Sequence, residues 1–194
     1  MLKIKVILGS TRQQRFGEQP AKWILEKAKA KGLDVELLDL RDYPLPLFDE
    51  PMSPTMAATQ GTYPYPISAE WTKKIGEADG FIFTVAEYNH GYTPVLKNAF
   101  DYVSTEWHKK PVAFVGYGTV GAARAVDQWR PVVAEQQMVS IRTAVHMVNP
   151  WGLMDDKGVA DMSSFDHSAD AMLDQLIWWG EALKEARAKD LPVK

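Results

Sequence analysis

The sequence of 194 residues contains no cysteine and only four histidines. Without thiols, the chain has no disulfide, no thiolate zinc site, no iron–sulfur cluster and no cysteine nucleophile. The histidines, at positions 90, 108, 146 and 167, do not follow metal-ligand spacing, so we expect no metal site. The Gly-x-Ser-x-Gly elbow of serine hydrolases is missing as well.

Positive charge and long apolar runs are also scarce. Lysine and arginine total 22 against 25 acidic residues, which gives a formal net charge of −3. Nucleic-acid binding needs an excess of cations, so we expect no nucleic acid as a partner. No run approaches the roughly 20 apolar residues of a membrane helix, and the N-terminal run 1–9 is too short and too rich in lysine for a secretory signal. We therefore expect a cytoplasmic protein with no membrane partner.

The sequence does contain a regular alternation of strand and helix patterns. Apolar runs typical of buried strands cover 3–8, 35–40, 80–85, 111–116 and 139–147. Helical patterns alternate with them over 17–31, 68–78, 94–104, 121–137 and 165–189. This order predicts an α/β fold with a parallel sheet and helices on both faces, in a single domain over residues 1–194. Residues 188–194 are expected to form a frayed tail.

Two long stretches show neither a strand pattern nor a helix pattern. The stretch 41–67 holds six prolines together with apolar side chains such as Leu45, Phe48 and Tyr65. A connection this long is usually functional or mobile, and its apolar residues predict that it lies against the body. We expect Ser68 to cap the helix that follows. The other loop, 149–164, is polar and contains glycine and aspartate.

The loop after the first predicted strand combines features that suit a phosphate. It reads Gly-Ser-Thr-Arg-Gln-Gln-Arg-Phe-Gly over 9–17, and a helix begins at its end. A helix N-terminus offers free N–H groups and partial positive charge. Ser10 and Thr11 provide hydroxyls, and Arg12 or Arg15 provides a guanidinium. The Walker pattern is absent, and two solvated arginines on a turn are the alternative interpretation.

The loop after the third predicted strand reads Ala-Glu-Tyr-Asn-His-Gly-Tyr-Thr-Pro over 86–94. A turn between a buried strand and a helix exposes main-chain N–H and C=O groups to the crevice at the carboxyl end of the sheet. Together with aromatic side chains, these groups would suit the edge of a planar heterocycle such as a flavin. The alternative is a tight turn whose aromatic residues fill the core.

The loop after the fourth predicted strand, Gly116–Gly121, matches Gly-x-Gly-x-x-Gly. A dinucleotide fingerprint also requires an acidic residue at the end of the next strand, about 20 positions on. The next predicted strand ends Ala-Val-His over 144–146 and has no acid. We therefore interpret these glycines as a loop that lets a flat ligand approach the backbone.

Taken together, the three loops resemble those of the NADPH-dependent FMN reductase family, whose flavodoxin-like members include quinone, chromate and azo-dye reductases. The first loop is similar to the family's Gly-Ser-x-Arg-x-x-Ser phosphate loop. The segment 87–101 is similar to Glu-Tyr-Asn-x-Ser-x-Pro-x-x-Leu-Lys-Asn-Ala-x-Asp. The resemblance covers residues 1 to about 145. It departs at Arg15, Ala86 and Gly91, where Ser, Pro and Ser are common.

The resemblance implies a flavodoxin-like three-layer sandwich with a five-stranded parallel sheet of order 2-1-3-4-5. It also implies FMN as the cofactor. Ser10 and Arg12 would hold the phosphate, with charge from Arg15 and main-chain groups of Phe16 and Gly17. The residues that would line the flavin ring are Glu87, Tyr88, Asn89, Gly91, Gly118 and Thr119.

The implied activity is an NAD(P)H oxidoreductase. A hydride passes from NADPH or NADH to FMN, and two electrons then pass to a small acceptor, such as a quinone, a free flavin, a metal ion or an azo compound, in a ping-pong scheme. We name no catalytic residue, because the flavin carries the chemistry. Family members are commonly dimers or tetramers, and exposed aromatic side chains would serve that interface: Tyr92, Phe100, Tyr102 and Trp107. The alternatives are a flavodoxin-like electron carrier, a redox-sensing regulatory flavoprotein and a nucleotide-binding Rossmann enzyme.

Overall fold

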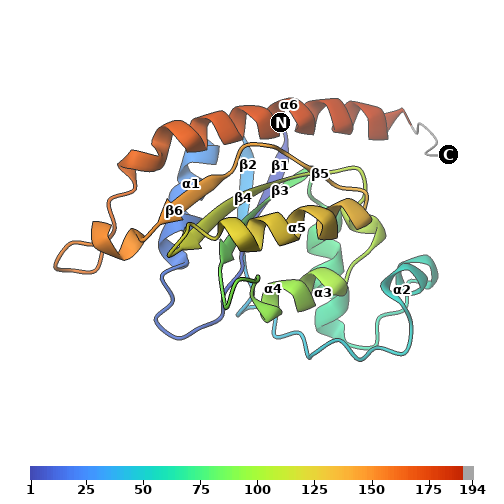
Figure 1. Ribbon diagram of the computed structural model, residues 1–194. Helices are drawn as coiled ribbons and strands as arrows, with labels where there is room; N and C mark the ends of the chain where they lie inside the picture. Colours follow the sequence, from blue (N-terminus) through green and yellow to red (C-terminus); the bar gives the residue numbers. More distant parts are fainter. Residues whose placement is uncertain (190–194) are drawn as a thin grey trace.

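The computed structural model describes residues 1–189 and places six parallel strands in one sheet (Figure 1). The sheet order is β2-β1-β3-β4-β5, and β6 also pairs with β4. The strands are β1 (Lys3–Leu8), β2 (Asp34–Asp39), β3 (Gly80–Ala86), β4 (Pro111–Gly118), β5 (Val139–Ser140) and β6 (Val145–Val148). The predicted parallel sheet and its order are confirmed. Of the frayed tail predicted over 188–194, residues 190–194 lie outside the described residues.

The last predicted strand, 139–147, is divided in two. β5 pairs with the start of β4 and β6 with its end. Between them, Arg130 Nη1 donates to the carbonyl of Ile141 at 2.8 Å, and Arg130 Nη2 donates to the carbonyl of Arg142 at 3.1 Å. A side chain from a helix thus takes the acceptors that a continuous strand would offer to the sheet. The prediction of one unbroken strand was wrong for this reason.

Helices cover both faces of the sheet (Figure 1). One face packs against α1 (Glu18–Ala30) and α6 (Asp166–Ala188), and the other against α3 (Pro66–Gly76), α4 (Pro94–Asp101) and α5 (Ala123–Glu135). Alternate residues of β3 serve the two cores, since Phe81 and Phe83 face one and Ile82 faces the other. This period-two division is why the strand is apolar along its whole length.

The proline-rich stretch contains a helix that the sequence analysis did not predict, α2 (Pro54–Gln60). Ser53 caps it by accepting from the N–H of Met56, and Gly61 ends it at φ +63°. The stretch lies against the body as expected, because Asn98 donates to the carbonyl of Pro46 at 2.7 Å. The prediction of Ser68 as a cap was wrong. Helix α3 begins at Pro66, and the Ser68 hydroxyl donates to the carbonyl of Tyr65.

Three of the aromatic residues predicted for a subunit interface are buried in the core. Phe100, Tyr102 and Trp107 are at most 3% exposed. Phe100 stacks on Trp107 with ring centroids 4.9 Å apart. Only Tyr92 keeps partial exposure, and it packs on Trp129. The interface prediction was wrong for these three residues, because their positions on α4 and the following turn point toward the sheet.

Candidate functional site

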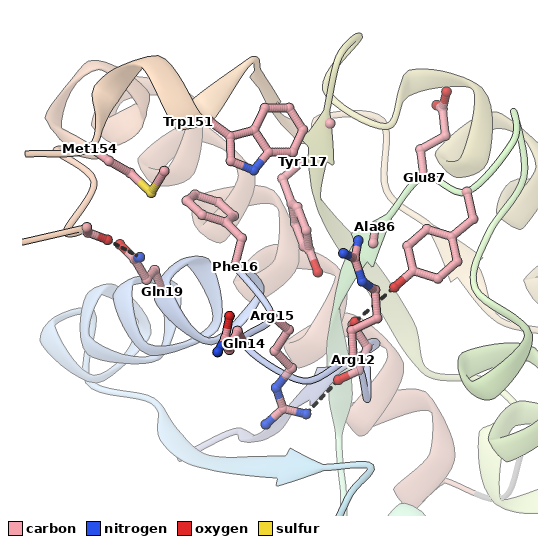
Figure 2. A pocket seen from close by; sticks show the side chains of 14 residues that line it. Arg12, Gln14, Arg15, Phe16, Gln19, Ala86, Glu87, Tyr117, Trp151 and Met154 are labelled. Carbon is pink, nitrogen blue, oxygen red and sulfur yellow. Dashed lines mark hydrogen bonds between the residues drawn. The ribbon is translucent and has the colours of Figure 1, made fainter.

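A cavity of about 430 Å³ opens at the carboxyl ends of β1, β3 and β4 (Figure 2). The strand order reverses between β1 and β3, which is where ligands of open parallel sheets bind. The residues that line the cavity are Ser10, Arg12, Gln14, Arg15, Phe16, Gln19, Ala86, Glu87, Tyr88, Tyr117, Gly118, Trp151, Met154 and Gly158.

The first loop is fastened to its neighbours at Gly9. A Cβ added there would lie 2.3 Å from the carbonyl oxygen of Thr84, so no larger residue fits. The Thr93 hydroxyl donates to the carbonyl of Gly9 at 2.6 Å. At the other end of the loop, Gly17 starts α1 without any side-chain cap. The helix therefore presents its partial positive charge beside the cavity.

The two arginines of this loop have different surroundings. Arg12 is exposed and extends into the cavity (Figure 2). The Arg15 side chain is 2% exposed and turns to the end of β2, where Nη1 donates to Asp39 Oδ1 at 2.8 Å. Arg15 also donates to the carbonyl of Ser10 at 2.5 Å and to Glu18 at 3.1 Å. The guanidinium of Arg15 is thus saturated by the protein itself.

The electrostatics of this pair follow from its geometry. Burial of Asp39 opposes its ionisation, but the Arg15 guanidinium and the N–H of Arg41 hold the pKa of this carboxyl below its ordinary value. Asp39 is therefore charged at neutral pH and keeps Arg15 in place. The ion pair fixes the loop after β1 to the end of β2.

The loop after β3 forms a tight turn. The N–H and C=O of Tyr88 exchange two 2.9 Å hydrogen bonds with those of Gly91. Asn89 and His90 between them have φ of +49° and +72°, the two positive values of a type I′ turn. Gln128 of α5 donates to the carbonyl of His90 at 2.9 Å and fixes the turn to that helix.

Glu87 supports this turn from behind the cavity. Its side chain is 5% exposed, and Arg124 Nε donates to Oε1 at 2.6 Å. Burial opposes ionisation, but the Arg124 guanidinium and the N–H of Ala125 hold the pKa of Glu87 below its ordinary value. Arg124 Nη1 also lies 2.7 Å from His90 Nε2. In Figure 2 the Glu87 carboxylate points away from the cavity centre.

Two tyrosines line the cavity. The Tyr88 hydroxyl shares a 3.2 Å hydrogen bond with Ser10 Oγ, which joins the first and second loops. Tyr117, at the end of β4, is 6% exposed, and burial raises the pKa of its hydroxyl. A Cβ at Gly17 would lie 2.3 Å from the Tyr117 hydroxyl oxygen. Glycine at position 17 therefore allows Tyr117 to reach the floor of the site.

The glycine loop after β4 is shaped by backbone packing. A Cβ at Gly116 would lie 2.5 Å from the carbonyl oxygen of Gly121. Gly121 has φ of +62° and packs against His146, whose Nδ1 lies 2.9 Å from its carbonyl oxygen. The pattern Gly-x-Gly-x-x-Gly here thus serves a compact turn, of which Gly118 reaches the cavity.

The remaining wall comes from residues 149–162, which we call the C-terminal arm. It contributes Trp151, Met154 and Gly158 to the cavity. Sequence reasoning treated this segment as a polar loop and assigned it no role. The signal that could have found it is the presence of Trp151, Leu153 and Met154 among polar residues.

The predicted site residues divide into two groups. Those that line the cavity are Ser10, Arg12, Arg15, Phe16, Glu87, Tyr88 and Gly118. Those that lie in the same loops without lining it are Gly17, Asn89, Gly91 and Thr119. Sequence reasoning missed the following lining residues: Gln14, Gln19, Ala86, Tyr117, Trp151, Met154 and Gly158.

Within residues 1–189, no group of three or more His, Asp or Glu side chains is placed to hold a metal ion. None of the helices in this part of the chain is both long and apolar enough to cross a membrane.

Comparison with known proteins identifies relatives of this chain. An NAD(P)H-dependent FMN reductase of a Nectria species is 39% identical over 131 residues, which are 66% of this chain and 65% of the relative. One from Schizosaccharomyces pombe is 39% identical over 137 residues, 70% of this chain and 68% of the relative. The chain thus matches about two thirds of the length of these relatives.

One solved structure is similar to this chain, and one family profile matches it. The structure is FerB, a flavoenzyme NAD(P)H:(acceptor) oxidoreductase from Paracoccus denitrificans. It is similar with a TM-score of 0.71 and 21% identity, over 92% of this chain and 98% of that one. The profile described as NADPH-dependent FMN reductase matches residues 2–152. The chain therefore belongs to the NADPH-dependent FMN reductase family.

Proposed function

We propose that this protein is an FMN-dependent NAD(P)H oxidoreductase that reduces a small-molecule acceptor. The observation that carries the proposal is the cavity at the β1/β3 switch point. A free guanidinium and an uncapped helix N-terminus lie on one side of it, and aromatic and main-chain groups lie on the other. This combination suits a ligand with an anionic tail and a planar polar head.

The phosphate of FMN would be held by the first loop. Arg12 supplies the charge and Ser10 a hydroxyl, while Phe16 and Gly17 supply main-chain groups at the start of α1. Arg15 acts indirectly, because its guanidinium is already paired with Asp39 and Glu18. Its hydrogen bond to the carbonyl of Ser10 holds the loop in the shape that presents Ser10 and Arg12.

The flavin ring would be held by the second and third loops. Tyr88 offers an aromatic face. Gly91 closes the turn through its two hydrogen bonds to Tyr88, and these fix the orientation of the Asn89 main chain. Gly118 and Thr119 form the opposite edge, where the glycine lets a flat group approach the backbone. All the predicted ring residues therefore remain part of the proposed flavin site. Glu87 acts indirectly, because its ion pair with Arg124 supports the turn.

The chemistry requires little more of the protein. When bound, FMN supplies two-electron transfer, taking a hydride from NADPH or NADH and passing electrons to the acceptor. The role of the chain is to bind and orient the reactants. We assign no catalytic acid or base, and we propose that both substrates use the same open side of the cavity in turn.

The test is the visible spectrum of the purified protein under anaerobic conditions. We expect the protein to take up one FMN per chain, NADPH or NADH to bleach the flavin absorbance, and a quinone to restore it. If neither NADPH nor NADH bleaches the flavin, the result would favour a flavodoxin-like carrier. A protein that takes up no FMN would overturn the proposal.

We propose that residues 1–194 form one FMN-binding domain, that the chain is a homodimer or homotetramer, and that it is cytoplasmic. Size-exclusion chromatography with light scattering tests the assembly state. A monomer at micromolar concentration would contradict it.

A further inference from the structure

The C-terminal arm places large apolar side chains beside the cavity without covering them. Trp151 is 46% exposed and Met154 is 37% exposed, although both line the cavity. Neighbouring exposed apolar side chains at the rim of a cavity are a feature of ligand-binding grooves. Its position at the edge of a ligand cavity points to a ligand.

Trp151 is the outermost of three neighbouring aromatic rings. Its ring centroid lies 6.3 Å from that of Phe16, which in turn lies 5.5 Å from Tyr117. The three rings come from the arm, the first loop and the end of β4, and Figure 2 shows them along one side of the cavity. They form a wall that a planar ring can contact.

The arm is tied to the body by one side chain near its tip. Gln19 of α1 donates from Nε2 to the carbonyl of Gly158 at 2.8 Å, and its Oε1 accepts from the N–H of Ala160 at 2.8 Å. At the base of the arm, the N–H of Asn149 donates to the carbonyl of Gly118 at 2.9 Å. Gln19 therefore connects the tip of the arm to α1, the helix that begins at the proposed phosphate site.

The arm also has internal order. Asp155 Oδ1 accepts from the N–H groups of Lys157 and Val159 at 2.9 Å each. Met154 and Ala160 form an isolated antiparallel β-bridge. A segment with such internal bonds moves as a unit. Gln19 therefore helps to position the unit that carries Trp151, together with the anchor at Asn149.

We propose that the arm is part of the flavin site, an inference that rests on the proposed function. Trp151 packs its indole against bound FMN, and Gln19 is the positioning residue that latches the arm over the cofactor. The arm would then slow cofactor release, because Gln19 keeps the indole against bound FMN.

The first experiment compares Trp151 with a tryptophan elsewhere. FMN is titrated into apoprotein, and its dissociation constant is measured by flavin fluorescence. We expect Trp151→Ala to raise Kd by about tenfold, the loss of one ring-stacking contact, and Trp151→Phe to stay within about threefold of wild type. Trp178→Ala is the matched control, because Trp178 is 64% exposed on α6 and does not line the cavity.

The second experiment tests the latch. We expect Gln19→Ala to raise the FMN dissociation rate severalfold and to speed tryptic cleavage after the exposed Lys157 in the apoprotein, with FMN slowing that cleavage in wild type. Gln60→Ala, at an exposed position on α2, is the control. These readouts report arm position without any turnover assay.

The outcomes separate the two proposals. If Arg12→Ala weakens FMN binding while Trp151→Ala and Gln19→Ala behave like their controls, the arm inference is overturned and the proposed function stands. If wild-type protein takes up no FMN, both are overturned. A Trp151→Ala effect that Trp151→Phe does not rescue also overturns the stacking role.

Discussion

Arg15 and Asp39 form an ion pair that joins the loop after β1 to the end of β2, with Arg15 Nη1 2.8 Å from Asp39 Oδ1. Its neighbour in the same loop, Arg12, points into the cavity (Figure 2). Two arginines three positions apart therefore have different tasks. One braces the loop, and the other is available to a ligand.

Replacing Arg12 should lower the affinity for FMN, whereas replacing Arg15 should lower the stability of the protein. Arg12→Ala should raise the Kd for FMN by about 10- to 100-fold, the loss of one charge-assisted contact, without lowering Tm. Arg15→Ala leaves Asp39 without its partner and should cost about 2 kcal/mol, or about 4–8 °C in Tm. Calorimetry and flavin titration check both variants. A stable Arg15→Ala protein that has lost FMN affinity would contradict this division.

The same pair predicts an acid-dependent contribution to stability. The folded-state pKa of Asp39 is lowered, so its contribution is present above the unfolded pKa of about 3.9 and is lost as the pH falls through the folded value. The free energy of unfolding should therefore be higher for wild type than for Asp39→Asn at pH 5–7. The difference should shrink below about pH 4. Urea unfolding at several pH values measures it, and a difference that is equal at pH 3 and pH 7 would count against the pair.

The ion pair between Arg124 and Glu87 should hold the type I′ turn. Arg124→Ala leaves a nearly buried carboxylate unpaired, so it should destabilise the protein more than Glu87→Gln does. The double variant should cost less than the sum of the single variants, with a coupling energy of about 1–3 kcal/mol. Urea unfolding gives the cycle, and amide exchange at Asn89 and His90 reports the turn. Additive effects would show that the two side chains act separately.

Gly17 should tolerate no side chain while Tyr117 keeps its hydroxyl. Gly17→Ala places a Cβ 2.3 Å from that oxygen and should cost about 1–3 kcal/mol. Tyr117→Phe in the same chain should recover part of the loss, because it removes the nearest atom. Gly76→Ala is the matched control, since its Cβ would meet nothing closer than 3.6 Å. Equal Tm values for the two alanine variants would contradict the packing argument.

Much of this fold was predictable from sequence because its signals are local. Buried parallel strands are apolar on both faces, and helices repeat their apolar residues every three to four positions. The carboxyl ends of parallel strands meet at one edge of the sheet, so the loops after β1, β3 and β4 could be placed together from their order alone. Ser10, Arg12 and Tyr88 were found in this way.

The sequence by itself determined the order of elements, the parallel sheet and the loops that surround the cavity. Only the tertiary structure decided that Arg15 pairs with Asp39, that Arg130 divides the last strand, that Phe100 and Trp107 are buried, and that Trp151 of the arm lines the cavity. Apolar periodicity reports that a residue is buried or exposed along its own element. It does not report which distant side chain it meets, because such pairs depend on how the elements pack in space.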